Sequence, residues 1–316
     1  MYEKFYGLTE KPFSLLPDPS FLVLGKKHSA AYTALEYGLV SQAGFTVVTG
    51  EVGSGKTTLI RHLLNQLDDD ITVGLVSSSH HEMGELLQWL LYAFNLDYRE
   101  THKVGLYDLF TQFLIDQYAS DKRTVLIVDE AQNLQPDVLE ELRLLSNINA
   151  DKHQVLQIIL VGQPQLRELL RHRDLLQFQQ RISVDFHLSE LDAEEARIYI
   201  LQRLRLAGRE KPLFTKNAIS LVYQASGGIP RVINTLCDTA LVYGFADQKQ
   251  VIDNEVIGKV LKDKRAAVDD ATQSLEQQSS VTPGQQQPVA DTKKQKITNF
   301  NRESAKLLFK KYYNEK

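Results

Sequence analysis

Residues Gly50–Thr57 have the types and the spacing of a loop that binds phosphate groups. They spell Gly-Glu-Val-Gly-Ser-Gly-Lys-Thr, which fits the pattern G-x-x-x-x-G-K-S/T. In such a loop, backbone N–H groups surround the phosphate oxygens, and the helix that follows adds its positive dipole end. Lys56 is expected to reach the β- and γ-phosphates of a nucleotide, and the Thr57 hydroxyl to ligate Mg²⁺. The residues predicted to bind the nucleotide are Gly50, Glu51, Val52, Gly53, Ser54, Gly55, Lys56, Thr57 and Thr58.

Two adjacent acids, Asp129 and Glu130, follow a buried apolar run at 124–128. In open α/β sheets, ligands bind at the carboxyl ends of the strands. Asp129 is expected to hold Mg²⁺, directly or through water, and Glu130 to polarise the attacking water as a general base. Two acidic residues that follow a strand usually lie in a solvated loop and have no catalytic role. Downstream of a phosphate-binding loop, they predict hydrolysis of a nucleoside triphosphate.

Three further polar residues stand at the ends of predicted elements. Gln163 follows a strand and can bridge the γ-phosphate and the attacking water. Arg181 directly precedes a strand, and Arg231 lies in the first turn of a helix. An arginine from the same chain or from a neighbour can stabilise the charge on a transferred phosphoryl group. The alternative for Gln163 is an ordinary glutamine in a loop. The alternative for Arg181 and for Arg231 is a surface ion pair.

The elements that must position these residues alternate along the chain, which predicts a parallel α/β sheet. Short apolar, β-branched runs predict strands at 45–49, 71–76, 124–128, 154–161 and 182–186. Helical periodicity predicts helices at 28–39, 58–64, 82–95, 106–118 and 136–147. Beyond His187 the strand signal ends, and helices are predicted at 193–207, 216–225, 230–245 and 254–263.

The sequence therefore predicts an α/β nucleotide-binding domain with an N-terminal arm at 1–188 and a small all-helical lid domain at 189–265. Residues 266–292 are rich in Gln, Ser, Asp and Pro, which predicts a flexible linker. Residues 293–316 place apolar side chains at helical spacing among lysines, which predicts a basic amphipathic helix. This tail either contacts an inner-membrane partner or an anionic lipid surface, or is simply solvated.

Composition limits the functions that are open to the chain. Its single cysteine, Cys237, allows no internal disulfide, which is typical of a reducing compartment. The N-terminus does not resemble a signal peptide, and no apolar run approaches the ~20 residues of a membrane helix. We therefore expect a cytoplasmic protein without a transmembrane segment. The net charge of −4 combines a basic tail with an acidic body, which disfavours non-specific DNA binding.

The motifs together resemble those of the AAA+ ATPases. The phosphate loop, Val-Asp-Glu-Ala-Gln, Val-Gly-Gln-Pro, Gln-Arg-Ile and Gly-Gly-Ile-Pro-Arg occur in the order and with the spacing of that family. The resemblance implies a P-loop NTPase sheet of five parallel strands with a helical lid. It also implies roles: Gln163 matches the sensor 1 position, where Asn is commoner. Arg181 matches the arginine finger offered to a neighbouring subunit, and Arg231 matches sensor 2 of the lid.

The N-terminal sequence resembles one group within this family. Met-Tyr-Glu-Lys-Phe-Tyr-Gly-Leu, then Lys-Pro-Phe and Pro-Asp-Pro, is similar to the ExeA/GspA group, which serves type II secretion. In that group the chain continues into a transmembrane helix and a periplasmic domain that binds peptidoglycan, and neither is present in this sequence. The difference favours short MshM-like members, which serve MSHA pilus biogenesis. The resemblance implies an inner-membrane assembly protein as partner.

Three functions compete at this point. The first is an ATPase that uses ATP and Mg²⁺ to drive or gate assembly of a cell-envelope machine, acting as a ring or a dimer with Arg181 supplied across subunits. The second is a DNA-dependent AAA+ regulator of the TniB-like transposition type, disfavoured by the acidic body and by the lack of a DNA-binding domain after the lid. The third is a nucleotide-gated adaptor without hydrolysis. A site that binds a nucleotide without hydrolysing it does not need a general base, so the presence of Glu130 argues against this third function.

Overall fold

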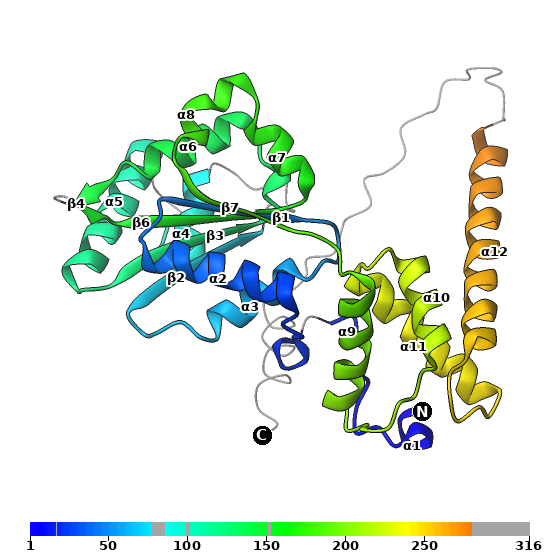
Figure 1. The fold of residues 1–316 in the computed structure, drawn as a ribbon. Helices are drawn as coiled ribbons and strands as arrows, with labels where there is room; N and C mark the ends of the chain where they lie inside the picture. The colour runs from blue at the N-terminus through cyan, green and yellow to red at the C-terminus, as the bar shows by residue number, and fades with distance from the viewer. Residues whose placement is uncertain (17, 78–85, 99–101, 151–152, 280–316) are drawn as a thin grey trace, which may run out of the picture. The chain divides into compact units, whose positions relative to one another are not determined.

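The computed structural model describes residues 1–16, 18–77, 86–98, 102–150 and 153–279. Five parallel strands form its central sheet in the order β2-β3-β6-β1-β7 (Figure 1). This confirms all five predicted strands. Their bounds are β1 Phe45–Gly50, β2 Ile71–Ser77, β3 Arg123–Asp129, β6 Leu156–Gly162 and β7 Ile182–Leu188.

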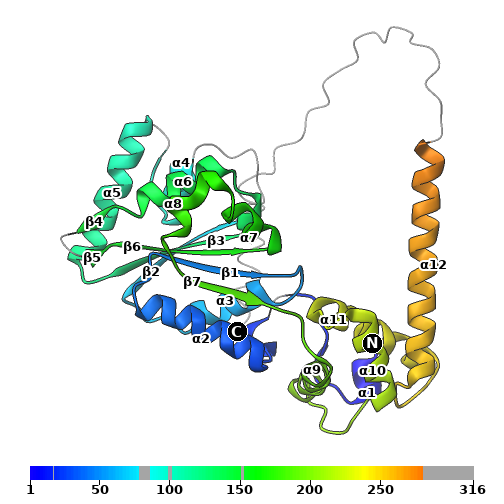
Figure 2. The same ribbon diagram turned by 45° about the horizontal axis from the view of Figure 1, so that its top comes forward.

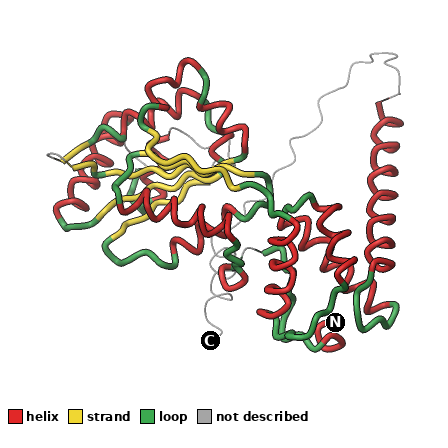
Figure 3. The backbone as a smooth tube through the Cα atoms, in the orientation of Figure 1, coloured by secondary structure: helices red, strands yellow, loops and turns green. Residues whose placement is uncertain are grey.

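Both faces of the sheet are covered by helices, which explains why the central strands are apolar without interruption. Along β3, Leu126 and Val128 point to one face, whereas Val125 and Ile127 point to the other. Figure 3 shows the helices on both sides of the strands. One face packs on α2 Lys26–Val40 and α3 Lys56–Leu64. The other packs on α4 Leu86–Ala93, α5 Lys103–Ala119, α6 Pro136–Leu145, α7 Pro164–Leu170 and α8 Leu176–Gln179.

Several short elements were not predicted from the sequence. The strands β4 Asn149–Ala150 and β5 His153–Gln154 pair as an antiparallel hairpin. The single-turn helices are η1 Pro19–Phe21, η2 Ala131–Asn133 and η3 Arg173–Leu175. Elements of two or three residues are too short to show a periodicity. Of the predicted helix at 82–95, residues 82–85 lie outside the described part of the chain.

A small helical lid domain follows the sheet, as predicted. Its helices are α9 Ala193–Leu206, α10 Lys216–Ser226, α11 Pro230–Ala246 and the start of α12 Asn254–Ser279. The first of these is stabilised by a capping box in which Asp192 and Glu195 each bind the other's backbone N–H. Thr215 caps α10, and Gly227 ends it in the left-handed conformation.

The aromatic side chains of the N-terminal arm pack on this lid rather than on the sheet. Its short helix α1, Glu3–Tyr6, lies beside α9–α11 in both ribbon views (Figures 1 and 2). Tyr2, Tyr6 and Phe13 are buried in the apolar core of the lid. The arm was predicted as part of the α/β domain; these aromatic side chains lie in the lid core, whereas Leu22 packs against the core between the sheet and α2–α3. Both faces of the sheet already have helical cover, whereas the lid helices leave an apolar surface that the aromatic arm fills.

The last described helix, α12, continues through residues 266–279, where a flexible linker was expected. This stretch contains no Gly or Pro and is rich in the good helix formers Ala, Gln, Glu and Leu, so the helix can extend. The chain divides into two units, 1–266 and 267–316, and α12 crosses that boundary. The rest of the predicted linker and the predicted helix at 293–316 lie outside the described residues. Within the described part, no helix combines the length and the apolar character that a membrane crossing requires.

Candidate functional site

The predicted phosphate loop connects the end of β1 to the start of α3. Gly53 and Gly55 adopt positive φ angles of 80° and 103°, which side chains disfavour. The ammonium group of Lys56 is buried beneath the loop and donates to the carbonyl oxygens of Gly50, at 2.8 Å, and Glu51, at 2.9 Å. Burial lowers the pKa of Lys56, and the nearby Glu130 and Asp129 oppose that shift. The loop therefore holds the Lys56 ammonium group through two of its own carbonyl oxygens.

The two predicted metal ligands are in direct contact. Asp129 is the last residue of β3, and the Thr57 hydroxyl donates to its carboxylate at 3.0 Å. The other carboxylate oxygen accepts a hydrogen bond from the backbone N–H of Glu130 at 2.9 Å. A hydroxyl and a carboxylate at this separation are oxygen ligands of the kind that Mg²⁺ prefers. The pair therefore fits the metal that the phosphate loop implies.

Glu130 is held by two glutamine side chains. Its carboxylate accepts from the amide nitrogen of Gln132 at 2.6 Å and from that of Gln163 at 3.1 Å. The carbonyl oxygen of Gln132 in turn accepts from the backbone N–H of Gln163 at 2.9 Å. Glu130 itself has φ 55°, an uncommon conformation for a residue other than glycine and one that clusters at functional sites. The ends of β3 and β6 are thereby linked through one carboxylate.

Gln132 is a site residue that sequence reasoning missed. It is the last residue of the Val-Asp-Glu-Ala-Gln motif. Its position in that motif, two residues after Glu130, was the one feature of the sequence that could have identified it as a site residue. The short helix η2 turns its amide back toward the sheet edge. A side chain added at Gly162 would lie 2.9 Å from the Gln132 oxygen, so the absence of a side chain there leaves room for this amide.

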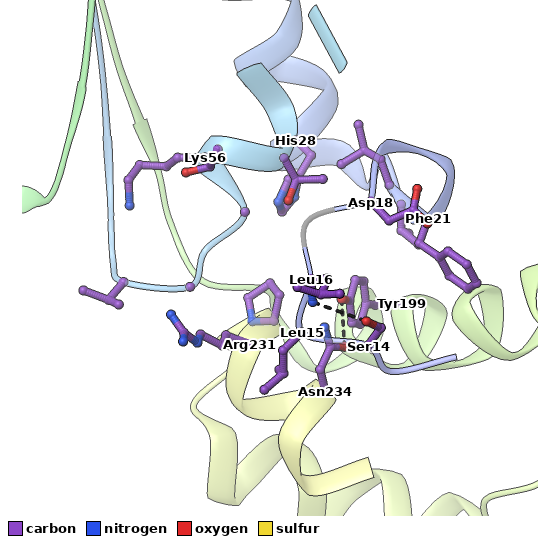
Figure 4. Close-up of a pocket in the computed structure, with 18 of the residues that line it drawn as sticks. Ser14, Leu15, Leu16, Asp18, Phe21, His28, Lys56, Tyr199, Arg231 and Asn234 are labelled. Atoms are coloured by element: carbon purple, nitrogen blue, oxygen red, sulfur yellow. Dashed lines mark hydrogen bonds between the residues drawn. The ribbon is translucent and has the colours of Figure 1, made fainter. Parts of the chain in front are cut away.

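A cavity of about 350 Å³ unites most of the predicted residues. Figure 4 shows Lys56 and Arg231 facing it from the loop and from the lid. The backbone N–H of Arg231 donates to the carbonyl of Gly53 at 3.1 Å, so α11 begins directly on the phosphate loop. The predicted residues that line the cavity are Val52, Gly53, Gly55, Lys56, Thr57, Thr58, Glu130, Gln163 and Arg231. Gly50, Glu51 and Ser54 contribute backbone carbonyls to the same loop.

Arg181 is the predicted residue that the structure places elsewhere. It is exposed and directly precedes β7. Because β7 runs parallel to β1, Ile182 lies beside Phe45, whereas Leu188 lies beside Gly50 at the phosphate loop. A strand of this length spans roughly 20 Å at ~3.3 Å per residue. Arg181 therefore cannot reach the phosphate loop of its own chain.

Two buried basic residues, for which the sequence suggested no individual role, also line the cavity, although the helix at 28–39 was expected to form part of the nucleotide pocket. His28, on α2, has a ring nitrogen 2.9 Å from the carbonyl oxygen of Ser54, and burial lowers its pKa. Arg203, on α9, contacts the arm through three hydrogen bonds. Arg203 belongs to the predicted helix at 193–207, for whose arginines the sequence predicted no role in the site. The missed signal was the position of Arg203 within the apolar stripe Ala196, Tyr199, Ile200, Leu204 and Ala207.

Comparisons with known proteins show which proteins this chain is similar to. An AAA domain matches residues 39–170. General secretion pathway protein A of Aeromonas hydrophila is 42% identical over 247 residues, which are 78% of this chain and 45% of that protein. This chain thus aligns with less than half of the length of that relative. The predicted resemblance to the ExeA/GspA group is confirmed.

Solved structures show the same fold at low identity. The ORC2 protein of Aeropyrum pernix, solved with ADPNP and ADP, is 16% identical, with a TM-score of 0.61 over 80% of this chain and 71% of its own. Cdc6p of Pyrobaculum aerophilum is 12% identical, with a TM-score of 0.59 over 76% and 67%. The Walker-type ATPase PABY2304 of Pyrococcus abyssi is 17% identical, with a TM-score of 0.56 over 85% and 80%. These similarities confirm the predicted P-loop fold.

Proposed function

We propose that this chain, which is 42% identical to General secretion pathway protein A over 247 residues and matches an AAA domain at residues 39–170, is an AAA+ ATPase that binds ATP with Mg²⁺ and hydrolyses the bond between its β- and γ-phosphates. The observation that supports this most strongly is the single cavity shared by Lys56, Glu130 and Arg231. These residues come from three separate elements and supply a cation, a carboxylate base and a second cation. This combination can bind a nucleoside triphosphate, activate water and stabilise the charge that develops on the phosphates.

The loop residues supply the binding side of this proposal. Lys56, which now donates to two carbonyl oxygens of the loop, would turn to the phosphates when ATP enters. Thr57 and Asp129 would hold Mg²⁺, which neutralises charge on the phosphate oxygens. Arg231 would approach the phosphates from the lid, since its backbone is already fixed to the loop at Gly53.

Glu130 is the base in this proposal. Its carboxylate accepts the proton of the attacking water, while the amides of Gln132 and Gln163 keep it oriented. Arg181 acts on the site of a neighbouring subunit, because its own site is out of reach. A ring or a dimer is therefore part of the proposal.

We infer the biological setting from the relative that shares 42% identity. That relative is named General secretion pathway protein A, so the proposed role of this chain is to drive or gate assembly of a secretion or MSHA-type pilus machine. The partner would be an inner-membrane assembly protein. The proposed location is the cytoplasm or the cytoplasmic face of the inner membrane, where the basic tail at 293–316 can contact anionic lipid or that partner.

Lys56→Ala tests the nucleotide site directly. We expect ATP binding and hydrolysis both to fall below detection, because the buried cation of the loop is the group that faces the phosphates. Isothermal titration with MgATP and a phosphate-release assay measure the two effects. The matched control is Lys259→Ala, which removes an exposed lysine of α12 and should retain both activities. Hydrolysis by Lys56→Ala at the wild-type rate would show that the assigned site is wrong.

A further inference from the structure

Arg203 is a buried cation whose role the nucleotide site does not yet explain. Only 7% of its surface is exposed. Among the residues that the structure describes, no carboxylate lies within ion-pair distance of its guanidinium group. Burial lowers its pKa, and Tyr199 and Asp18 oppose the shift at longer range. A buried charge without a paired acid is costly, so its hydrogen bonds must compensate for the lost hydration.

Those hydrogen bonds all go to the backbone of the N-terminal arm. Arg203 donates to the carbonyl oxygen of Pro12 at 2.6 Å, to that of Phe21 at 3.2 Å and to that of Ser14 at 3.2 Å. Its guanidinium carbon also lies 4.6 Å from the centroid of the Phe21 ring. None of the three carbonyls belongs to a strand ladder, so Arg203 is the partner that satisfies them. One side chain thereby fixes two separate parts of the arm.

Between these fixed points, Ser14, Leu15 and Leu16 of the arm line the same cavity as the phosphate loop. Leu15 is 54% exposed and Leu16 is 76% exposed, and both line the cavity (Figure 4). Tyr199, one turn before Arg203 on α9, lines the same side. In Figure 4, Lys56 lies on the left of the cavity, whereas Leu16 and Tyr199 lie nearer its middle and right. A nucleotide with its phosphates at Lys56 would therefore place its base and ribose against this apolar wall.

We propose that Arg203 is a positioning residue that holds the arm as the binding wall for the nucleotide base, so that base recognition depends on the lid. The inference rests on the proposed ATP-binding function. Arg203 does not touch the phosphates in this account, which distinguishes it from Lys56 and Arg231. Its fork of donors matches three carbonyls at once, a geometry that a lysine ammonium group cannot reproduce.

The test compares two ligands that share phosphates and differ in the base. MgATP and inorganic tripolyphosphate are titrated into full-length wild type, Arg203→Met and Arg203→Lys. For Arg203→Met we expect the Kd for ATP to rise about tenfold or more, since three charge-assisted hydrogen bonds are lost, while the Kd for tripolyphosphate stays unchanged. Arg203→Lys should show a smaller rise. In hydrolysis assays, KM should rise with kcat retained.

Arg205→Met is the matched control, because Arg205 is an exposed arginine on the same helix. It should bind both ligands as the wild type does. An equal loss of ATP and tripolyphosphate affinity in Arg203→Met, or unchanged ATP affinity, would overturn the inference. If Arg203→Met does not fold, Arg203→Lys decides by the same two titrations. Wild type that binds neither ligand would instead contradict the proposed function, so the two failures are distinguishable.

Discussion

Replacing Glu130 with glutamine is expected to lower ATP hydrolysis by about 10²–10⁴-fold, the usual contribution of a general base. The substituted amide has nearly the same shape, but it cannot accept the proton of the attacking water. ATP binding should remain, because Lys56 and the loop backbone are untouched. Single-turnover hydrolysis and a MgATP titration measure the two quantities separately.

The surroundings of Glu130 provide the control for this prediction. Gln132 and Gln163 both donate to the same carboxylate oxygen, so the amide oxygen of Glu130→Gln can still accept both of these bonds. The melting temperature should therefore stay close to that of the wild type. A hydrolysis rate near the wild-type value in Glu130→Gln would contradict the assignment of the base.

Arg181→Ala is expected to lower hydrolysis by about 10³–10⁵-fold while ATP binding is retained, as is typical when an arginine finger is removed. The structure motivates this prediction by exclusion, since Arg181 is exposed at the end of β7 that is remote from the phosphate loop. Arg181→Lys should be nearly as inactive, because an ammonium group lacks the planar fork that binds a phosphoryl group. Steady-state phosphate release measures both variants.

Mixing variants tests whether Arg181 acts between subunits. Arg181→Ala keeps an intact phosphate loop, and Lys56→Ala keeps the arginine. In an equal, random mixture about a quarter of the sites would pair an intact loop with a neighbour's arginine, so about a quarter of the wild-type rate should return. If the mixture stays as inactive as its components at concentrations where the subunits associate, the finger does not act in trans.

The sheet could be predicted because each of its strands is recognisable from its own short stretch of sequence. Strands buried on both faces must be apolar throughout, so the runs around Val125–Val128 and Ile158–Val161 stand out from the helical periodicity between them. The phosphate loop and Asp129–Glu130 were predictable because each motif adjoins a strand end. Parallel strands bring those ends to one edge, which places the motifs together without further information.

The remaining features depend on contacts between distant segments, which one sequence does not reveal. The aromatic arm shows no periodicity that would identify the lid as its partner, although Phe13 lies 6.0 Å from Phe214 between ring centroids. Arg203 could not be separated from the other arginines of α9 until its acceptors on the arm were known. Gln132 also accepts a hydrogen bond from the backbone of Gln163, which follows a different strand.

The measurement that most directly tests the central claim is the ATPase rate per subunit as a function of protein concentration. A site completed by a neighbour's Arg181 predicts a rate per subunit that rises with concentration and then saturates as subunits associate. The same titration with Glu130→Gln should remain flat near zero. A wild-type rate per subunit that is substantial and independent of concentration, in a protein shown to be monomeric, would contradict a shared catalytic site.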